Sequence, residues 1–304
     1  MNVLFFWELI FYMKYLFILN PISGGRKNPT KIKSAVDRIF QNSDHTYEFV
    51  FTSYAGEAKI LSQNGAKDGF DVVVAAGGDG TINEVATGIL GTEAALGIIP
   101  LGSGNGLARS FGVPLDLSKS IDFLINPKIT SVDVGKANDH YFFGVCGLGY
   151  DAIVGKKFQE FGTRGPLPYF LIGIKELVRY KPEKVCLNFN DQQIEVSPLL
   201  ITISNTKQYG NGAIISPNAD PQDGKLEICI INMLSFVKAV RATRRLFNGT
   251  IDKIAEYSQY TTDSLQIVAE HENGVFHTDG EPHDRPKTTH IKLLYNTLKV
   301  CANL

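Results

Sequence analysis

In the first part of the chain, up to about Ile125, hydrophobic residues follow two spacing patterns. Short apolar runs predict strands, and apolar residues three or four positions apart predict helices. We expect strands at Tyr15–Leu19, Tyr47–Phe51, Val72–Ala76 and Leu96–Leu101, and helices at Thr30–Phe40, Ala55–Gln63, Thr81–Leu90 and a further segment that ends at Gly112. The run Val72–Ala76 has no polar alternation, which is typical of a parallel strand covered on both faces. A repeated order of strand, loop and helix predicts an α/β domain with a parallel sheet.

After Asn126 the pattern changes to closely spaced strand-like runs. We expect strands at Ile129–Lys136, Tyr141–Val145, Val185–Phe189, Ile194–Val196, Leu199–Ser204, Leu226–Ile231, Gln266–Glu270, Gly274–Thr278, Ile291–Leu294 and Leu298–Cys301, with helical inserts at Lys156–Lys181 and Ser235–Phe247. Many short strands predict a sandwich or a barrel. We therefore expect an α/β domain over residues 1–128, a mostly antiparallel β-sandwich over residues 129–304, and a cleft between them.

The N-terminal segment Met1–Tyr12 is apolar and holds the only tryptophan. It lacks the basic start and the small-residue cleavage site of a secretory signal. Glu8 and Lys14 interrupt it, and a transmembrane helix needs roughly 20 apolar residues. Either translation starts at Met13, or the segment is a short appendage that touches a membrane. We favour the start at Met13, because the residues that follow form a complete opening strand.

Composition and charge exclude some classes of partner. The chain is 44% hydrophobic and 20% charged, as in ordinary globular proteins, and its 304 residues suit two domains. A net charge of −1 gives no broad basic surface for nucleic acid, so contact with an anionic membrane would need local patches. The four cysteines lie far apart, which favours a reduced, cytoplasmic chain. We expect a soluble protein or a peripheral one at the inner face of the membrane.

Three glycine-rich loops each follow an expected strand of the first domain. They are Ser23-Gly24-Gly25 after Asn20-Pro21, Gly77-Gly78-Asp79-Gly80-Thr81, and Gly102-Ser103-Gly104-Asn105-Gly106. Loops of this kind gather at the carboxyl edge of a parallel sheet, where glycines let the backbone approach a phosphate and the next helix offers free amides. One such loop can be a simple tight turn, but three together favour a phosphate site.

The second loop carries further information. Thr81 and Glu84 have the spacing of a capping box, so we expect the helix to begin at Thr81. No loop matches the Walker or the dinucleotide pattern. Asp79 would repel a bare phosphate, which favours a Mg²⁺-nucleotide or a ribose contact.

The motifs NPISGGR, GGDGTINEV and PLGSGNGLAR, followed by GLGYDA at Gly147–Ala152 and DGEPH at Asp279–His283, resemble in order the diacylglycerol kinase catalytic family. That family includes bacterial soluble lipid kinases and the sphingosine kinases. The resemblance runs from about Met13 to the end of the chain. It implies a kinase that uses ATP and Mg²⁺ to phosphorylate a hydroxyl of a diacylglycerol-like or sphingoid lipid at a membrane surface. GGDG alone is less specific, because NAD kinases and phosphofructokinases share it.

The resemblance also implies roles for individual residues. ATP would be bound by Asn20, Pro21, Ser23, Gly24, Thr52, Gly77, Gly78, Asp79, Gly80, Thr81, Asn83 and Ser103. Glu281 would be the general base, with Asp79 as a second catalytic residue. Asp223 would anchor a structural Mg²⁺, assisted by backbone oxygens of Asp220 and Lys225. His277 stands where many relatives carry Gln.

Sequence patterns alone leave other interpretations open for these segments. Asp279-Gly280 can be a hairpin turn with a solvated Glu281, and Asp220 and Asp223 can lie in a surface turn. We expect His271, His277 and His283 to be ordinary polar histidines. Lys156–Lys181 and the basic residues Lys238, Arg241 and Arg245, on one helical face, suit an anionic membrane or are simply solvated.

Two other functions compete with a lipid kinase. One is an NAD kinase-like phosphotransferase, and the other is a nucleotide-binding regulator without catalysis. The sequence does not choose among diacylglycerol, sphingoid base, ceramide and undecaprenol-like alcohols as the acceptor. An exposed sheet edge in the second domain is compatible with a homodimer.

Overall fold

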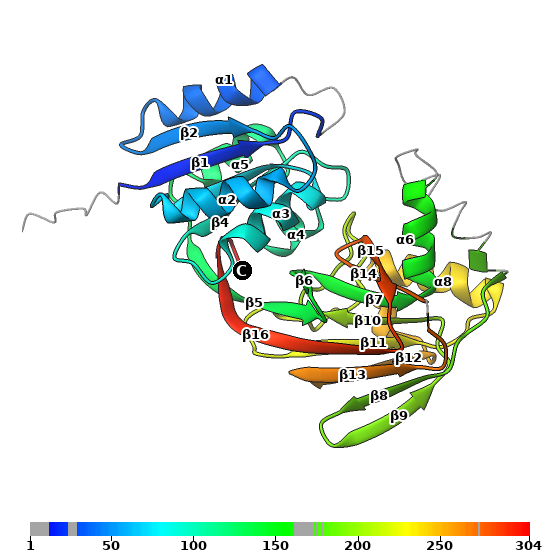
Figure 1. Ribbon diagram of the computed structural model, residues 1–304. Helices are drawn as coiled ribbons and strands as arrows, with labels where there is room; N and C mark the ends of the chain where they lie inside the picture. Colours follow the sequence, from blue (N-terminus) through cyan, green and yellow to red (C-terminus); the bar gives the residue numbers. More distant parts are fainter. Residues whose placement is uncertain (1–11, 24–28, 161–172, 174–175, 178, 273) are drawn as a thin grey trace, which may run out of the picture.

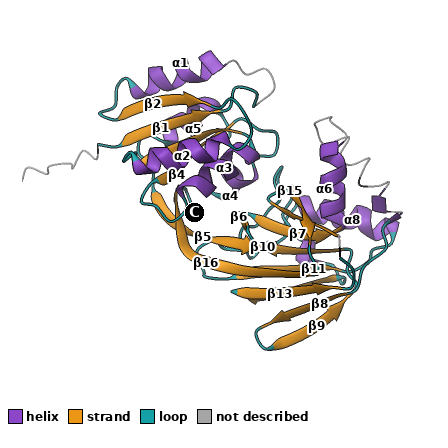
Figure 2. Cartoon of the chain, viewed as in Figure 1, coloured by secondary structure: helices purple, strands orange, loops and turns teal. Residues whose placement is uncertain are grey.

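The computed structural model describes residues 12–23, 29–160, 173, 176–177, 179–272 and 274–304. Figure 1 shows two bodies joined by sheet, with helices gathered around the first and strands dominating the second. Figure 2 separates the two kinds of element by colour and shows the same division. The predicted combination of an α/β domain and a β-sandwich is confirmed.

The first domain is a parallel sheet in the order β2-β1-β3-β4. Its strands are β1 (Lys14–Leu19), β2 (Thr46–Phe51), β3 (Val72–Gly77) and β4 (Ala95–Pro100), and its helices are α1 (Pro29–Phe40), α2 (Glu57–Lys67), α3 (Asp79–Ile89), α4 (Gly106–Ser110) and α5 (Leu117–Phe123). Val73 and Ala75 pack into a core with α2 and α3, whereas Val72 and Val74 pack into another with α1. Both faces of β3 are therefore covered, as its continuous apolar sequence requires.

The second domain stacks antiparallel strands in two sheets. Its elements are β5 (Ile129–Ala137), β6 (His140–Phe142), β7 (Val145–Gly149), α6 (Tyr150–Glu160), β8 (Val185–Phe189), β9 (Gln192–Val196), β10 (Leu200–Ser204), β11 (Leu226–Ile231), α8 (Phe236–Phe247), η1 (Ile251–Lys253), β12 (Tyr257–Thr262), β13 (Ser264–Ala269), β14 (Gly274–Thr278), β15 (Glu281–Arg285) and β16 (Thr288–Cys301). The six-stranded sheet has the order β12-β11-β10-β7-β14-β15. Leu148, Ile201 and Phe276 point from it into the core between the sheets.

The last strand joins the two domains. β16 pairs antiparallel with β13 and β5, and its residues Lys299 and Val300 then pair parallel with Ala95 and Leu96 of β4. The first domain's sheet therefore continues into one ten-stranded sheet, which ends at β8 and β9. The expected strands Ile291–Leu294 and Leu298–Cys301 are one strand with an irregularity between them. The boundary at residue 128 stays a prediction, and the chain returns across it at the C-terminus.

Several elements of the described chain were not predicted, among them α5, η1, β12 and β15. Helix α5 is short, and its N-cap is Asp116, whose side chain accepts a hydrogen bond from Lys119 N. Strand β12 (YSQYTT) and strand β15 (EPHDR) have polar or charged sequences, and both lie at the edges of the six-stranded sheet. Edge strands need fewer apolar residues because part of their surface faces water, so apolar runs do not reveal them.

The predicted capping box is wrong. Helix α3 begins at Asp79 with Gly78 as its N-cap, two residues before the expected start at Thr81. The Glu84 side chain instead accepts hydrogen bonds from Gly56 N at 2.9 Å and Ala58 N at 3.2 Å, at the beginning of α2. Because α2 packs against α3, Glu84 satisfies amide groups of the neighbouring helix rather than those of its own.

Candidate active site

The loops at the carboxyl edge of the first sheet lie against one another. Asn20, directly after β1, donates from its backbone N to Ala76 O at 3.1 Å and from Nδ2 to Thr81 Oγ1 at 3.1 Å. Thr52, directly after β2, donates from its backbone N to Leu19 O at 3.0 Å. The segments that begin at Asn20, Thr52 and Gly77 thus meet at the edge where the sequence predicts a phosphate site. Gly24 lies outside the described residues.

Glycine is required where the second and third loops meet. A Cβ atom on Gly102 would lie 2.9 Å from Gly78 Cα, closer than real Cβ atoms approach backbone. A Cβ atom on Gly77 would lie 2.5 Å from Thr81 Cβ. The two loops therefore pack backbone to backbone, while Ser103 at the tip of the third loop is exposed.

Asp79 binds the third loop. Its Oδ2 accepts from Asn105 N at 2.9 Å and its Oδ1 from Gly106 N at 2.7 Å. Burial raises the pKa of Asp79, although these amide bonds act in the opposite direction. The sequence suggested that a cation or a hydroxyl would stand beside this carboxylate; backbone N–H groups do so here, and Asp79 holds Asn105 and Gly106 in position.

Asp279 plays a similar part in the second domain. It lies in the two-residue turn between β14 and β15, where Asp279 and Gly280 have φ angles of 49° and 88°. Its Oδ2 accepts from Phe143 N at 2.7 Å, and its Oδ1 accepts from Gly144 N at 2.9 Å and Val145 N at 2.8 Å. Burial raises the pKa of Asp279, and the three amides lower it. The hairpin turn that the sequence left open is present, and it is anchored by its own aspartate.

Glu281 begins β15 directly after this turn. It pairs with Thr278 across the hairpin, and its side chain is exposed. Within the part of the chain that the structure describes, its carboxylate has no hydrogen bond and no ion pair. The anchored Asp279 fixes the backbone from which Glu281 projects.

One small cavity joins the two domains. It measures about 50 Å³ and is lined by Asp79, Asn83, Gly106, Leu107, Gly144, Val145, Gln208, Tyr209 and Asp279. Asn83 Oδ1 and Gln208 Oε1 are buried, and neither has a hydrogen-bond partner among the described residues. Buried amide oxygens are normally satisfied, so these two acceptors mark the cavity as a place for a ligand that offers hydrogen-bond donors or a cation.

A segment of the second domain closes over the third glycine loop. Asn211 N donates to Gly104 O at 3.1 Å, and Ser110 Oγ donates to Thr206 Oγ1 at 3.2 Å. A Cβ atom on Gly106 would lie 2.9 Å from Tyr209 O. Sequence reasoning missed this segment, although its Gly210-Asn211-Gly212 cluster was a signal of the same kind as the loops it touches.

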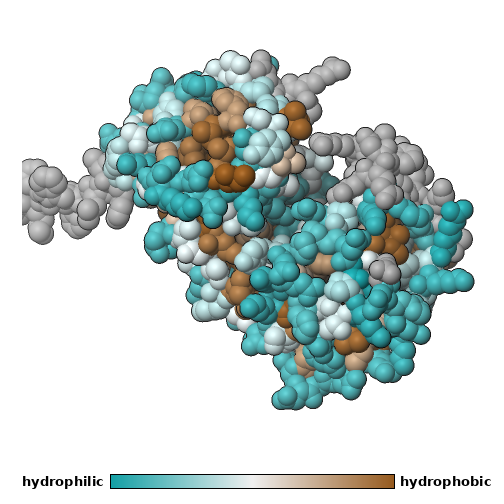
Figure 3. Space-filling model, viewed as in Figure 1, coloured by the Kyte–Doolittle hydropathy of each residue, from teal (hydrophilic) through white to brown (hydrophobic). Residues whose placement is uncertain are grey.

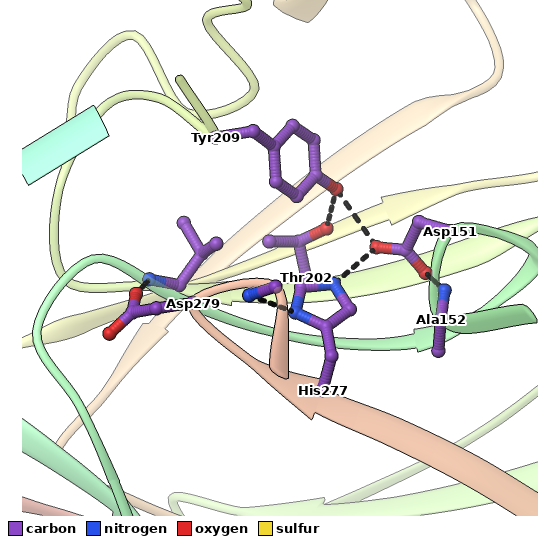
Figure 4. Close-up of polar contacts among 8 residues, drawn as sticks. Asp151, Ala152, Thr202, Tyr209, His277 and Asp279 are labelled. Carbon is purple, nitrogen blue, oxygen red and sulfur yellow. Dashed lines mark hydrogen bonds and ion pairs between the residues drawn. The ribbon is translucent and has the colours of Figure 1, made fainter. Parts of the chain in front are cut away.

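Asp151 and His277 form a buried pair beside the cavity, drawn in Figure 4. His277 Nε2 lies 3.3 Å from Asp151 Oδ2, and Gly280 N donates to His277 Nδ1 at 3.3 Å. Because Nδ1 accepts, the neutral ring carries its proton on Nε2 and donates it to Asp151. Tyr209 Oη also donates to Asp151 Oδ2, at 3.1 Å. The pair connects the turn before Glu281 with the segment that covers the glycine loop.

Glycine is also required beneath this pair. A Cβ atom on Gly147 would lie 2.2 Å from His277 Nε2 and 2.4 Å from Asp151 Oδ2. Gly147 and Asp151 both belong to the GLGYDA motif, to which the sequence gave no individual role. The structure gives the motif a physical function, since Gly147 makes room for a pair that Asp151 completes.

The expected metal residues lie outside the cavity. Asp220 Oδ1 accepts from Gln222 N at 3.0 Å, and Asp223 Oδ1 accepts from Lys225 N at 2.9 Å. Buried Asp133 lies beside them, and its Oδ2 accepts from Gly224 N at 2.8 Å. Burial raises the pKa of Asp133, and the negative charges of Asp223 and Asp220 raise it further. Over the described ranges, no group of three or more His, Cys, Asp or Glu side chains is arranged to hold a metal.

Known proteins match this chain over nearly all of its length. Residues 14–137 match the diacylglycerol kinase catalytic domain, and residues 144–302 match the YegS C-terminal NAD kinase beta sandwich-like domain. The chain is 30% identical to the diacylglycerol kinase of Bacillus subtilis (strain 168) over 76% of its own length and 78% of that protein's. The chain belongs to the diacylglycerol kinase family. Membership confirms the resemblance and the class of enzyme, a kinase, and implies ATP as the phosphoryl donor.

Further relatives agree with this assignment. A protein of Yersinia pestis (strain Pestoides F) named "Probable lipid kinase YegS-like" is 30% identical over 88% of this chain and 90% of its own length. Two solved structures from Bacillus anthracis str. Sterne have the same fold, with TM-scores of 0.80 and 0.73 at 24% and 22% identity. Each match covers 96% of this chain. The matches cover 98% and 97% of the two solved chains, respectively.

Proposed function

We propose that this kinase transfers the terminal phosphoryl group of ATP to a hydroxyl of a diacylglycerol-like or sphingoid lipid, with Glu281 as the general base. The main support is the cavity that Asp79 and Asp279 share. The glycine-rich loops that suit a phosphate reach this cavity from the first domain, and the turn before Glu281 reaches it from the second. The Bacillus subtilis relative named as a diacylglycerol kinase supports the class of acceptor.

The phosphates of ATP would bind over the loops that begin at Asn20, Gly77 and Gly102. Phosphoryl transfer needs mainly positioning and neutralisation of charge. Gly78 and Gly102 let the second and third loops pack backbone to backbone, and α3 directs its N-terminal amides to the same edge. Thr52, Thr81, Asn83 and Ser103 add polar side chains around this edge. Asp79 acts from behind the loop by holding Asn105 and Gly106.

The acceptor hydroxyl needs a base, since an alcohol is a poor nucleophile at neutral pH. The exposed Glu281 carboxylate is free to take a proton, whereas Asp279 already accepts three amide hydrogen bonds. We therefore assign proton removal to Glu281 and positioning of the turn to Asp279.

A structural Mg²⁺ suits the segment from Asp220 to Lys225. The Asp133, Asp220 and Asp223 carboxylates lie close enough to raise the pKa of Asp133, and a cation would relieve that repulsion. Asp223 would supply a carboxylate oxygen, and Asp220 and Lys225 backbone oxygens. When bound, the ion would neutralise the charge of these carboxylates.

The test is a panel of acceptors with the purified full-length chain, Mg²⁺ and labelled ATP. We expect labelled phosphate on diacylglycerol, sphingosine, ceramide or an undecaprenol-like alcohol. Glu281→Gln should lower kcat by about 10²- to 10⁴-fold, whereas Glu270→Gln, at an exposed position after β13, should leave it unchanged. Labelling of NAD alone would indicate an NAD kinase-like enzyme. Nucleotide binding without any product would indicate a regulator.

A further inference from the structure

Helix α8 exposes an unusual share of its apolar side chains. Of its twelve residues only Ala242 is buried. Phe236, Val237, Val240 and Phe247 are 60%, 58%, 56% and 57% exposed, and Met233 just before the helix is 41% exposed. Single exposed apolar residues are common, but a group of this kind marks an interaction surface.

The exposed apolar residues share one side of the helix. Phe236 and Val240 are four residues apart, and Phe247 follows seven residues later, which places all three on one face at 3.6 residues per turn. Ala242 and Leu246 lie on the other side and pack into the core. We call the exposed set Phe236, Val237, Val240 and Phe247 the apolar stripe.

Two unpaired cations border the apolar stripe. Arg241 and Arg244 are exposed, and the side chain of neither makes a hydrogen bond or an ion pair with any described residue. By contrast, Lys238 pairs with Glu256, and Arg245 Nη1 donates to Thr250 O at 3.3 Å. Of the expected basic residues Lys238, Arg241 and Arg245, only Arg241 has no side-chain partner among the described residues, and Arg244 joins it.

The helix is connected to the candidate active site through one core cluster. Ala242 and Leu246 pack in the same cluster as Val145 and Tyr209, which both line the cavity. In Figure 1, α8 lies at the end of the β-sandwich away from the first domain, and Figure 3 shows a hydrophobic patch there among hydrophilic residues. Docking through α8 would thus hold the β-sandwich domain against the docked surface.

We propose that α8 is a docking surface for an anionic phospholipid bilayer. The apolar stripe enters the boundary between headgroups and acyl chains, and Arg241 and Arg244 contact anionic headgroups. The inference rests on the proposed function for its purpose, because a lipid substrate has to be taken from a bilayer. None of the described helices is long and apolar enough to span a membrane. A bilayer also fits better than a second copy of the chain. A two-fold contact through α8 would place Arg241 and Arg244 of one copy beside the same arginines of the other, and these like charges repel.

The experiment is flotation of the full-length chain with vesicles of phosphatidylcholine, with and without phosphatidylglycerol. We compare wild type with a stripe variant (Phe236→Ser, Val240→Ser) and an arginine variant (Arg241→Ala, Arg244→Ala). Ile60→Ser is the matched control, because Ile60 is 50% exposed on another amphipathic helix, α2. Circular dichroism confirms folding, and sedimentation gives the oligomeric state. Turnover of diacylglycerol in detergent micelles is measured in parallel.

We expect each double variant to reduce binding to anionic vesicles by about tenfold or more, with Ile60→Ser unchanged and micellar turnover preserved. Equal flotation of wild type and both variants would overturn the proposal. So would a dimer that the stripe variant dissociates, because α8 would then contact a second copy. If the wild-type protein shows no turnover of diacylglycerol in micelles and an α8 variant still loses vesicle binding, the proposed function is rejected and the docking proposal is upheld.

Discussion

Asp79 and Asp279 line one cavity from different domains, and the carboxylate of each accepts hydrogen bonds from backbone amides of a neighbouring loop. Asp79 fixes the glycine loop before α4, and Asp279 fixes the approach to β7 and the turn that carries Glu281. The two aspartates therefore hold the two walls of the candidate active site in shape, and Glu281, the base that we propose, directly follows the turn that Asp279 anchors.

Replacing Asp79 by Asn should weaken both the fold and ATP binding. One of the two amide bonds at Asn105 and Gly106 would lose its acceptor, because an Asn side chain has a single oxygen. We expect a loss of about 1–3 kcal/mol in the free energy of unfolding and a higher KM for ATP. Urea unfolding and initial rates measure the two effects. Asp68→Asn, an exposed change at the end of α2, is the control, and equal behaviour of the two variants would contradict the role of Asp79.

His277 should act as a positioning residue rather than a catalytic one. His277→Ala removes the acceptor for Gly280 N and the partner of Asp151, so the turn that carries Glu281 loses its support. We expect kcat to fall about tenfold or more while KM for ATP stays near the wild-type value. His277→Gln, whose amide can both donate and accept, should restore most of kcat. If kcat of His277→Gln is no higher than kcat of His277→Ala, the imidazole itself is needed.

Acid should destabilise the protein through His283. Burial, together with the positive charges of the nearby His140 and His277, lowers the pKa of His283 to about 4. The unfolded chain binds this proton below its ordinary pKa of about 6.5, so the stabilising contribution is complete above pH 6.5 and is lost as pH falls towards 4. Across this pH range, the melting temperature should fall less steeply with decreasing pH for His283→Asn than for wild type. Parallel curves would exclude His283 as a source of the acid sensitivity.

Magnesium should stabilise the wild-type chain through Asp223. A ligand that binds only the folded state raises the unfolding midpoint with its concentration. We expect Mg²⁺ to raise the midpoint for wild type and EDTA to abolish the rise, with Asp223→Ala insensitive to both. Asp139→Ala, in another exposed turn, controls for loss of a surface charge. A Mg²⁺ response that survives in Asp223→Ala would place the ion elsewhere.

Local sequence determined most of the elements and the place of the phosphate loops. The continuous apolar run Val72–Ala76 predicts a buried parallel strand, and glycines after three strands predict loops at one sheet edge. Both features follow from contacts within a few residues, so periodicity and turn chemistry reveal them. The order of motifs then added the family.

Tertiary structure alone decided how these parts are held together. Asp151 and His277 are 126 residues apart, and Phe143 and Asp279 are 136 apart, yet each pair is in hydrogen-bond contact. Glu84 has the spacing to cap its own helix but binds Gly56 N and Ala58 N of another. β16 joins both domains by pairing with β4 and β5. Such partners depend on which distant segments pack side by side, and no local pattern in one sequence records that choice.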